Sequence, residues 1–247
     1  MQKEQLFHIL DSVDSTNNYA MARINEGMAQ HGMAWFAREQ TQGKGQRGRQ
    51  WHSQADSNII MSIAIMPTPA LALNPFFLSA LVVETCNSFL RKISGEDFFI
   101  KWPNDIYWRD RKTGGILIEN KYSGTQWHWA VIGIGINVNQ QEFNEGAMHA
   151  ISLKQVSGVI HYNPVSLAKE LHQFLMEKIN SAHPHQFEAL ITGYNNYLYK
   201  RGAQVKLKKE NAVFTSTIVE VNQYGQLITR DSLERIFNFG EVQWVIP

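Results

Sequence analysis

The sequence predicts an α+β protein, in which helices pack on a largely antiparallel sheet and a small β domain follows. Apolar runs of strand length alternate with amphipathic helical stretches through most of the chain. The two longest strand candidates, 114–122 and 126–138, are joined by a Ser-Gly turn as in a β-hairpin. After Arg201-Gly202 only short strands are expected, separated by turn signals. We therefore expect one domain over residues 1–200 and a second over residues 201–247.

Capping residues predict where the helices of the first domain begin. Asp14 and Ser15 are N-cap candidates for a helix that runs through Ile24. Asn74-Pro75 and Asn163-Pro164 each combine a cap residue with a proline in the first helical turn. The expected helices cover residues 17–24, 75–94, 164–182 and 184–200.

Short apolar runs predict the strands. Trp127, Trp129 and Val131 alternate with His128 and Ala130, which is the period-2 pattern of a sheet. The other strands expected in the first domain cover residues 5–11, 33–39, 58–66 and 98–100. The strands expected in the second domain cover residues 205–207, 213–221, 227–229, 235–239 and 242–246, which is typical of a small β-barrel.

Composition limits the location and the partners of the protein. The 247-residue chain has a formal net charge of +1, so it lacks the basic excess of a general nucleic-acid binder. Its one cysteine, Cys86, excludes an internal disulfide. No run approaches the roughly 20 apolar residues of a membrane span, and the first residues lack the apolar core of a signal peptide. We expect a cytoplasmic protein with no membrane partner.

A glycine-rich loop at 40–51 carries three cations and ends in Trp51. Backbone N–H groups and basic side chains of such a loop can approach a phosphate or a carboxylate closely. Gly43, Gly45 and Gly48 match G-x-G-x-x-G, but no amphipathic helix opens at Gly48, so we reject dinucleotide binding. A merely solvated basic loop would need neither the glycines nor the tryptophan. The loop is therefore predicted to bind an anion.

A second candidate is Lys101, which ends an apolar strand and is followed at once by Trp102-Pro103-Asn104-Asp105. Turn chemistry accounts for the Pro-Asn-Asp run. It does not account for a lysine at an apolar strand end, because desolvating its charge is costly unless an anion is near. We expect Lys101 to neutralise a charged ligand.

Five motifs then occur in order along the chain: 14–17 (DSTN), 40–51 (QTQGKGQRGRQW), 101–105 (KWPND), 114–119 (GGILIE) and 133–139 (GIGINVN). In this order they resemble the biotin protein ligases, over roughly residues 8–155 by motif and over the rest by layout. The resemblance implies a mixed sheet flanked by helices, similar to class II synthetases, with a C-terminal SH3-like β-barrel. It also implies a single-function ligase, because the first motif leaves no room for the N-terminal DNA-binding domain that some members carry.

The resemblance implies a two-step reaction that uses ATP, Mg²⁺ and biotin. The carboxylate of biotin attacks the α-phosphate of ATP, which gives biotinyl-5′-AMP and pyrophosphate. A lysine of the acceptor domain of a biotin-dependent carboxylase then takes the biotin. Because a carboxylate is a weak nucleophile toward an anionic phosphate, alignment and charge neutralisation would carry catalysis. Mg²⁺ is expected to arrive with the triphosphate, since the sequence shows no strong metal-binding cluster.

The resemblance also implies which residues form the site. Lys101 is the expected catalytic residue, because it would neutralise both anions. The expected biotin-binding residues are Ser15, Thr16, Asn17, Gln40, Lys44, Gly45, Gln46, Lys101 and Gly115. The expected ATP-binding residues are Arg47, Arg49, Trp51, Asn104 and Asn137.

The chain departs from the family pattern in the glycine loop. Many members read Gly-Arg-Gly-Arg where this chain has Gly43-Lys44-Gly45-Gln46. Gln46 carries no charge at a position where an arginine often faces the adenylate phosphate. The sequence leaves open whether Arg47 or Arg49 takes over this contact.

Two other functions stay open at this point. A lipoate ligase or an octanoyltransferase would share the catalytic fold, although the tryptophan-closed loop and the Lys101–Asp105 run favour biotin. A nucleic-acid-binding module could use the basic loop and the β domain, but the near-zero net charge argues against it. The sequence does not identify the acceptor protein, and it leaves a homodimer open.

Overall fold

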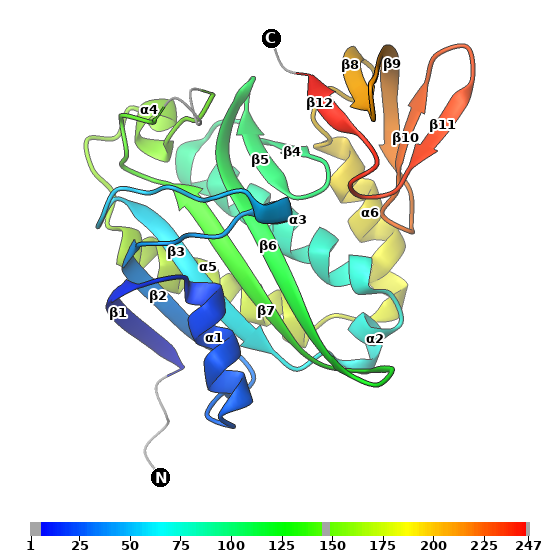
Figure 1. Ribbon diagram of the computed structural model, residues 1–247. Coiled ribbons are helices and arrows are strands. Elements are labelled where there is room, and N and C mark those ends of the chain that lie inside the picture. Colours follow the sequence, from blue (N-terminus) through cyan, green and yellow to red (C-terminus); the bar gives the residue numbers. More distant parts are fainter. Residues whose placement is uncertain (1–5, 145–148, 246–247) are drawn as a thin grey trace.

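The computed structural model describes residues 6–144 and 149–245, and it contains two β-sheets (Figure 1). The larger sheet has seven strands in the order β1-β2-β3-β7-β6-β5-β4. Only β1 and β2 pair in parallel within this sheet, so it is mixed and largely antiparallel, as expected. Its strands are β1 (Phe7–Val13), β2 (Met33–Gln40), β3 (Asn58–Ile65), β4 (Phe99–Lys101), β5 (Asp105–Trp108), β6 (Arg111–Ser123) and β7 (Gln126–Asn137).

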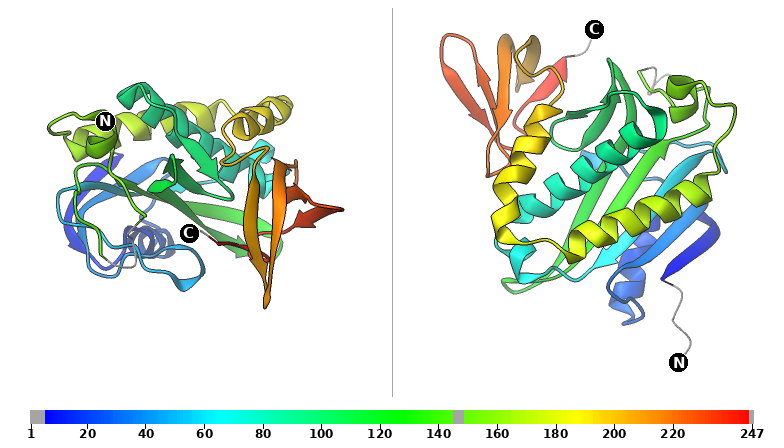
Figure 2. Two further views of the ribbon diagram at one scale, coloured as in Figure 1. Left: turned by 90° about the horizontal axis from the view of Figure 1, so that it is seen from above. Right: turned by 180° about the vertical axis from the view of Figure 1, so that it is seen from behind.

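Helices cover both faces of the larger sheet. The helix α1 (Thr16–Asn25) lies on one face, where it contacts β2, β3 and β7. The long helices α3 (Pro75–Ser94) and α5 (Pro164–Asn180) cover the other face and bury the main core (Figure 2). The remaining helical segments are η1 (Gln46–Gly48), α2 (Pro69–Ala72), α4 (Leu153–Ser157), η3 (Pro184–Gln186) and α6 (Phe187–Asn196). Within the described ranges, no helix is long and apolar enough to cross a membrane.

Asn74 and Asn163 cap their helices as expected, whereas Ser15 occupies the N-cap position of α1 without a side-chain cap bond. The side chain of Asn74 accepts a hydrogen bond from the backbone N–H of Phe76 at 3.0 Å. Asn163 accepts one from Ser166, also at 3.0 Å. Each bond satisfies a donor that the first helical turn would otherwise leave unpaired. Gly95 ends α3 with a φ of 74°, a left-handed conformation that favours glycine.

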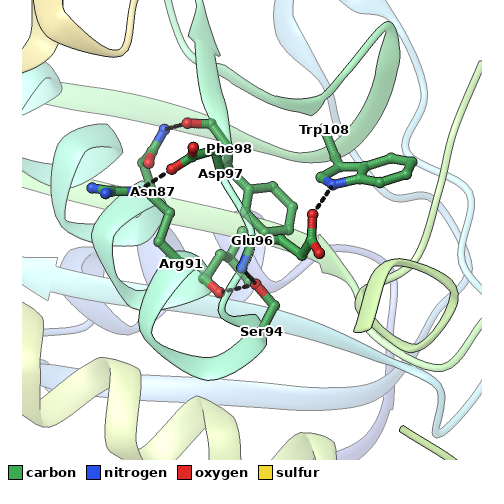
Figure 3. A network of polar contacts seen from close by, with 8 residues as sticks. Asn87, Arg91, Ser94, Glu96, Asp97, Phe98 and Trp108 are labelled. Atoms are coloured by element: carbon green, nitrogen blue, oxygen red, sulfur yellow. Dashed lines mark hydrogen bonds and ion pairs between the residues drawn. The ribbon is translucent and has the colours of Figure 1, made fainter. Parts of the chain in front are cut away.

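Polar contacts join α3 and the turn that follows it to the segment before β4 and to the end of β5 (Figure 3). Asn87 donates from its side-chain amide to the carbonyl of Phe98 at 3.0 Å, just before β4. The indole N–H of Trp108, at the end of β5, donates to Glu96 at 3.3 Å. The β4–β5 hairpin is therefore held against a helix whose own position is fixed by the core.

The smaller sheet contains β8 (Gln204–Lys209), β9 (Ala212–Val221), β10 (Leu227–Arg230), β11 (Glu234–Phe237) and β12 (Gln243–Val245). They are antiparallel in the order β11-β10-β9-β8-β12. The expected SH3-like barrel is an open sheet over the described residues, because no ladder joins β11 to β12. Closure requires the edge strands to pair along their length, and these edges have only four and three residues. The proposed boundary at residue 200 stays a prediction.

Three short elements were not expected from the sequence. The strand β5 begins at Asp105, a position that the Pro-Asn-Asp turn signal assigned to a loop. The helices α2 and α4 have only four and five residues, too few for a periodic pattern. The last helix ends at Asn196 rather than near residue 200. Residues 5 and 246, the ends of two expected strands, lie outside the described residues.

Candidate active site

The glycine loop crosses the face of the larger sheet that carries α1. The loop is itself folded: the N–H of Gly45 donates to the carbonyl of Arg49 at 2.7 Å, and the N–H of Trp51 donates to the carbonyl of Gly43 at 2.8 Å. These two bonds make a narrow hairpin around η1. The hairpin fixes the backbone position of Trp51, and therefore the point at which the Trp51 ring contacts the sheet.

Glycines on the sheet let α1 and Trp51 lie directly on the strands. A Cβ added to Gly133 would lie 2.3 Å from Oδ1 of Asn17, and one added to Gly135 would lie 2.7 Å from the Trp51 ring. No side chain could occupy these positions without moving the helix or the indole. Gly115 pairs with Gly135 on β7 and with Asp105 on β5. The two glycines therefore form a row without side chains across the face, and Asp105 lies at its end.

A chain of hydrogen bonds connects the first turn of α1 to three strands. Gln40 accepts at Oε1 from both the N–H and the hydroxyl of Thr16, at 2.7 and 3.0 Å. Ser62 lies 2.6 Å from Oδ1 of Asn17, whose Nδ2 donates to Glu119 at 2.7 Å. Because Oε1 of Gln40 faces Thr16, its Nε2 lies on the side of the glycine loop. The amide is thus oriented to donate to an acceptor in the site.

Charged groups converge at the other end of this face. Lys112 Nζ lies 2.7 Å from Oδ1 of Asp105 and 5.7 Å from the centre of the Trp51 ring. Lys101 is paired with Asp105 in the β4–β5 register and is 8% exposed. Burial lowers the pKa of Lys101 to about 8; Asp105 opposes this shift, and Lys112 and Arg49 add to it. Lys112 is thus the cation paired with Asp105, and Lys101 and Arg49 add positive charge nearby.

Lys112 was missed by the reasoning from sequence. It lies three positions before Gly115, so strict alternation along a strand would place the two on opposite faces. The pairing of β5 with β6 shifts register between Ile106 and Tyr107, which leaves Thr113 as an extra residue. The bulge brings Lys112 Nζ within 3.2 Å of the point where a Cβ on Gly115 would lie. The sequence did offer one signal for Lys112, a basic residue two positions before the Gly114-Gly115 pair.

Unpaired polar atoms near Trp51 suit a nucleotide. Nε1 of Trp51 and Oγ1 of Thr113 are buried, and within the described part of the chain neither has a hydrogen-bond partner. Asn137 donates from Nδ2 to the carbonyl of Lys112, the residue before Thr113, at 3.4 Å. A purine base would offer a flat face to the indole. Over the same residues, no group of three or more His, Cys, Asp or Glu side chains could hold a metal ion.

The other expected residues lie in two places. Ser15 is buried at the start of α1, next to Thr16 and Asn17. Lys44 is on the same side, with Nζ 3.8 Å from Oε1 of Glu119. Gln46 and Asn104 instead line a separate hollow of about 450 Å³ between the larger sheet and the smaller one.

Arg47 also turns toward the smaller sheet. Its φ is 56°, and its guanidinium lies 3.7 Å from where a Cβ on Gly240 would be. Arg49 acts electrostatically on Lys101 and on Tyr107. Of the two arginines that the sequence left open, Arg49 is therefore the one near the cluster of cations around Asp105.

The sequence is similar to those of several known proteins. A family model described as the biotin/lipoate A/B protein ligase family matches residues 9–137. The bifunctional ligase/repressor BirA of Bacillus spizizenii is 29% identical over 236 residues, which are 92% of this chain and 71% of that protein. The BirA protein of Escherichia coli is 35% identical over 143 residues, but these are 57% of this chain and only 43% of that protein.

A solved structure gives the same result for the fold. The biotin protein ligase from Aquifex aeolicus, in complex with biotin and ATP, superposes with a TM-score of 0.81 at 25% sequence identity. The superposition covers 97% of this chain and 98% of that one. The similarity thus includes the smaller C-terminal sheet as well as the larger one.

Proposed function

Since the chain belongs to the biotin/lipoate A/B protein ligase family, we propose that it is an ATP-dependent biotin ligase. It activates biotin as biotinyl-5′-AMP and transfers the biotin to one lysine of the acceptor domain of a biotin-dependent carboxylase. The observation that carries this proposal is the Lys112–Asp105 ion pair beside the Trp51 ring, with Lys101 opposite Asp105 in the β4–β5 register and a row of glycines next to it. Such a group of cations suits two anions that must approach each other, a carboxylate and a phosphate.

In the first step, a carboxylate oxygen of biotin attacks the α-phosphorus of ATP. The bond to the bridging oxygen breaks, and pyrophosphate leaves with that electron pair. Lys112 is the best-placed group to neutralise both anions, because its ammonium lies between Trp51 and Asp105. Lys101 adds positive charge to the site; its own contact with substrate stays a prediction. Mg²⁺ accompanies the triphosphate.

The polar end of the α1 face binds the ring of biotin. Gln40 donates to the ureido carbonyl, which requires the amide orientation that Thr16 imposes. Ser15 and Asn17 shape the pocket beside the ring, Lys44 and Gly45 cover it from the loop, and Gly115 leaves room for the valeryl chain. The proposed contacts with the nucleotide are Trp51, Asn137 and Arg49, with Arg47 and Asn104 farther out near the smaller sheet. Gln46, predicted to contact biotin, lines the hollow near the smaller sheet instead.

In the second step, the amine of the acceptor lysine attacks the carbonyl carbon of the mixed anhydride. An amide bond forms, AMP leaves, and the amine loses a proton. The acceptor amine must reach the same α1 face, so the loop at 40–51 has to leave a path beside Trp51. We place this reaction in the cytoplasm, where the carboxylase partners would be made. The proposal is compatible with either a monomer or a homodimer.

Exchange of labelled pyrophosphate into ATP tests the first step. Exchange should require biotin and should not occur with lipoic acid or octanoic acid at the same concentration. Exchange that depends on lipoic or octanoic acid instead of biotin would overturn the choice of substrate. Exchange with none of the three acids would overturn the ligase assignment.

A further inference from the structure

The smaller sheet contacts the cation cluster through an aromatic residue, Trp244 on β12. The ammonium of Lys101 lies 5.5 Å from the centre of the Trp244 ring and 4.7 Å from that of Tyr107. The Tyr199 ring packs against the other two rings, with its centre 5.1 Å from that of Tyr107 and 5.7 Å from that of Trp244. We call the three rings of Tyr107, Tyr199 and Trp244 the aromatic cage.

The cage holds Lys101 by electrostatics as well as by packing. A cation within about 6 Å of an aromatic ring centre is attracted to the ring face, most strongly to indole. The Tyr107 hydroxyl also accepts a hydrogen bond from Lys101 Nζ at 3.1 Å. The N–H of Trp244 is buried without an acceptor in the described part of the chain. The indole is therefore held by its faces, one of which lies toward the ammonium.

Lys101 and Lys112 compete for the same carboxylate. Lys101 is opposite Asp105 in the β4–β5 register, so a lysine extended across the hairpin would reach that side chain. In the structure Asp105 is paired with Lys112 instead, at 2.7 Å. Arg49 adds a third positive charge nearby. A lysine released from the cage would be drawn to Asp105, and Lys112 would lose the partner that fixes its ammonium.

We propose that Trp244 is a positioning residue of the active site: it keeps Lys101 away from Asp105, so that the Asp105–Lys112 pair stays in place. The smaller sheet thus contributes directly to the geometry of the first reaction step. The kinetic part of this inference rests on the proposed function. The placement of Lys101 in the aromatic cage does not depend on the proposed function.

Two substitutions of Trp244 separate ring electrostatics from packing. Trp244→Phe keeps an aromatic face toward Lys101, whereas Trp244→Leu keeps an apolar side chain without one. We expect Trp244→Leu to lower kcat for biotin-dependent pyrophosphate exchange about tenfold, which lies between the sizes of an exposed and a fully desolvated cation–π contact. Trp244→Phe should stay within about twofold of the unmodified protein, with the KM for biotin unchanged in both, because α1 forms the ring pocket.

Trp127 provides the matched control. It stacks on Tyr122 with ring centres 6.2 Å apart, at the far end of the β6–β7 hairpin. Trp127→Leu and Trp127→Phe should have equal kcat values. Equal kcat values for Trp244→Leu and Trp244→Phe would overturn the proposal. A fall in kcat for Trp127→Leu as large as that for Trp244→Leu would also overturn it.

A second measurement works even if the protein is not a biotin ligase. Acetylation of lysine amines by acetic anhydride, read peptide by peptide by mass spectrometry, reports how accessible Lys101 is. Lys101 should be acetylated several-fold faster in Trp244→Leu than in the unmodified protein, and at the original rate in Trp244→Phe. Equal rates in all three proteins would overturn the cage. If Trp244→Leu does not fold, Trp244→Met replaces it with the same expected result. Absent exchange in the unmodified protein would overturn the proposed function alone.

Discussion

At the scale of single residues, the structure adds Lys112 to Lys101, the one lysine of this region that the sequence singled out. Lys101 is buried against Tyr107, whereas Lys112 is paired with Asp105 and lies near the Trp51 ring. The bulge at Thr113 brings Lys112 to the face of the larger sheet that carries α1. A bulge depends on how two strands pair, so it cannot be read from the alternation within one strand.

Replacing Lys112 should therefore be more damaging than replacing other lysines of β6. Lys112→Gln removes the charge but keeps a polar side chain of similar length. We expect adenylate formation to slow by about 10²–10³-fold, as for loss of a single preorganised contact in an active site. Lys121→Gln is the control, because Lys121 donates to Asn25 at the other end of the same strand. Similar rates for the two variants, measured by pyrophosphate release, would rule out the role of Lys112.

Gln46 tests how the chain retains its intermediate. We expect Gln46→Arg to slow the release of biotinyl-5′-AMP with little change in biotin affinity, since a guanidinium can pair with a phosphate through two hydrogen bonds. Gln42→Arg, on the exposed start of the loop, is the control for added charge. Single-turnover release decides the matter: unchanged or faster release from Gln46→Arg means that Arg49 already holds the phosphate.

At the scale of elements, the helix starts could be predicted because their signals are local. Asn74 and Asn163 cap the helices that follow them. The strand β5 could not be predicted, since a tertiary pairing with β6 overrides the turn signal at Asp105. The open form of the smaller sheet likewise depends on the length of its edge strands. Local chemistry therefore predicts where elements begin, and pairing decides how they combine.

The glycine loop is the element that we expect to depend most on ligand. Its cations are largely exposed, and two backbone hydrogen bonds form its hairpin. We expect trypsin to cleave after Arg47 or Arg49 more slowly when biotin and ATP are added, because the ligands supply missing partners. Cleavage after Lys209, at the exposed turn between β8 and β9, should not change. Equal protection at both places would indicate general stabilisation instead of loop ordering.

At the scale of the whole molecule, a buried histidine predicts how stability depends on pH. His172 on α5 is bonded to the carbonyl of Gly32 at 2.8 Å and packs against Phe7. Burial lowers its pKa below the ordinary value of 6.5, and the bond to Gly32 only partly opposes this. The unfolded chain then binds a proton more readily than the folded one. The free energy of unfolding should therefore fall as the pH decreases through 6.5.

Denaturant unfolding between about pH 7.5 and about pH 5.5 measures this effect. His172→Gln keeps a donor for the Gly32 carbonyl but cannot be protonated, so its free energy of unfolding should change less over this range. His161→Gln, at an exposed position, should follow the unmodified protein. The same pH dependence in all three proteins would contradict a buried neutral His172.

The central claim, that this fold activates biotin and passes it to a protein, is tested most directly on the acceptor. The protein is incubated with ATP, Mg²⁺, biotin and a biotin-acceptor domain, and the mass of each acceptor peptide is measured. We expect the mass of one biotin on a single lysine, and no addition when ATP is omitted. An acceptor that stays unmodified after incubation with the unsubstituted protein would contradict the account. An acceptor that takes lipoic acid in place of biotin would contradict it as well.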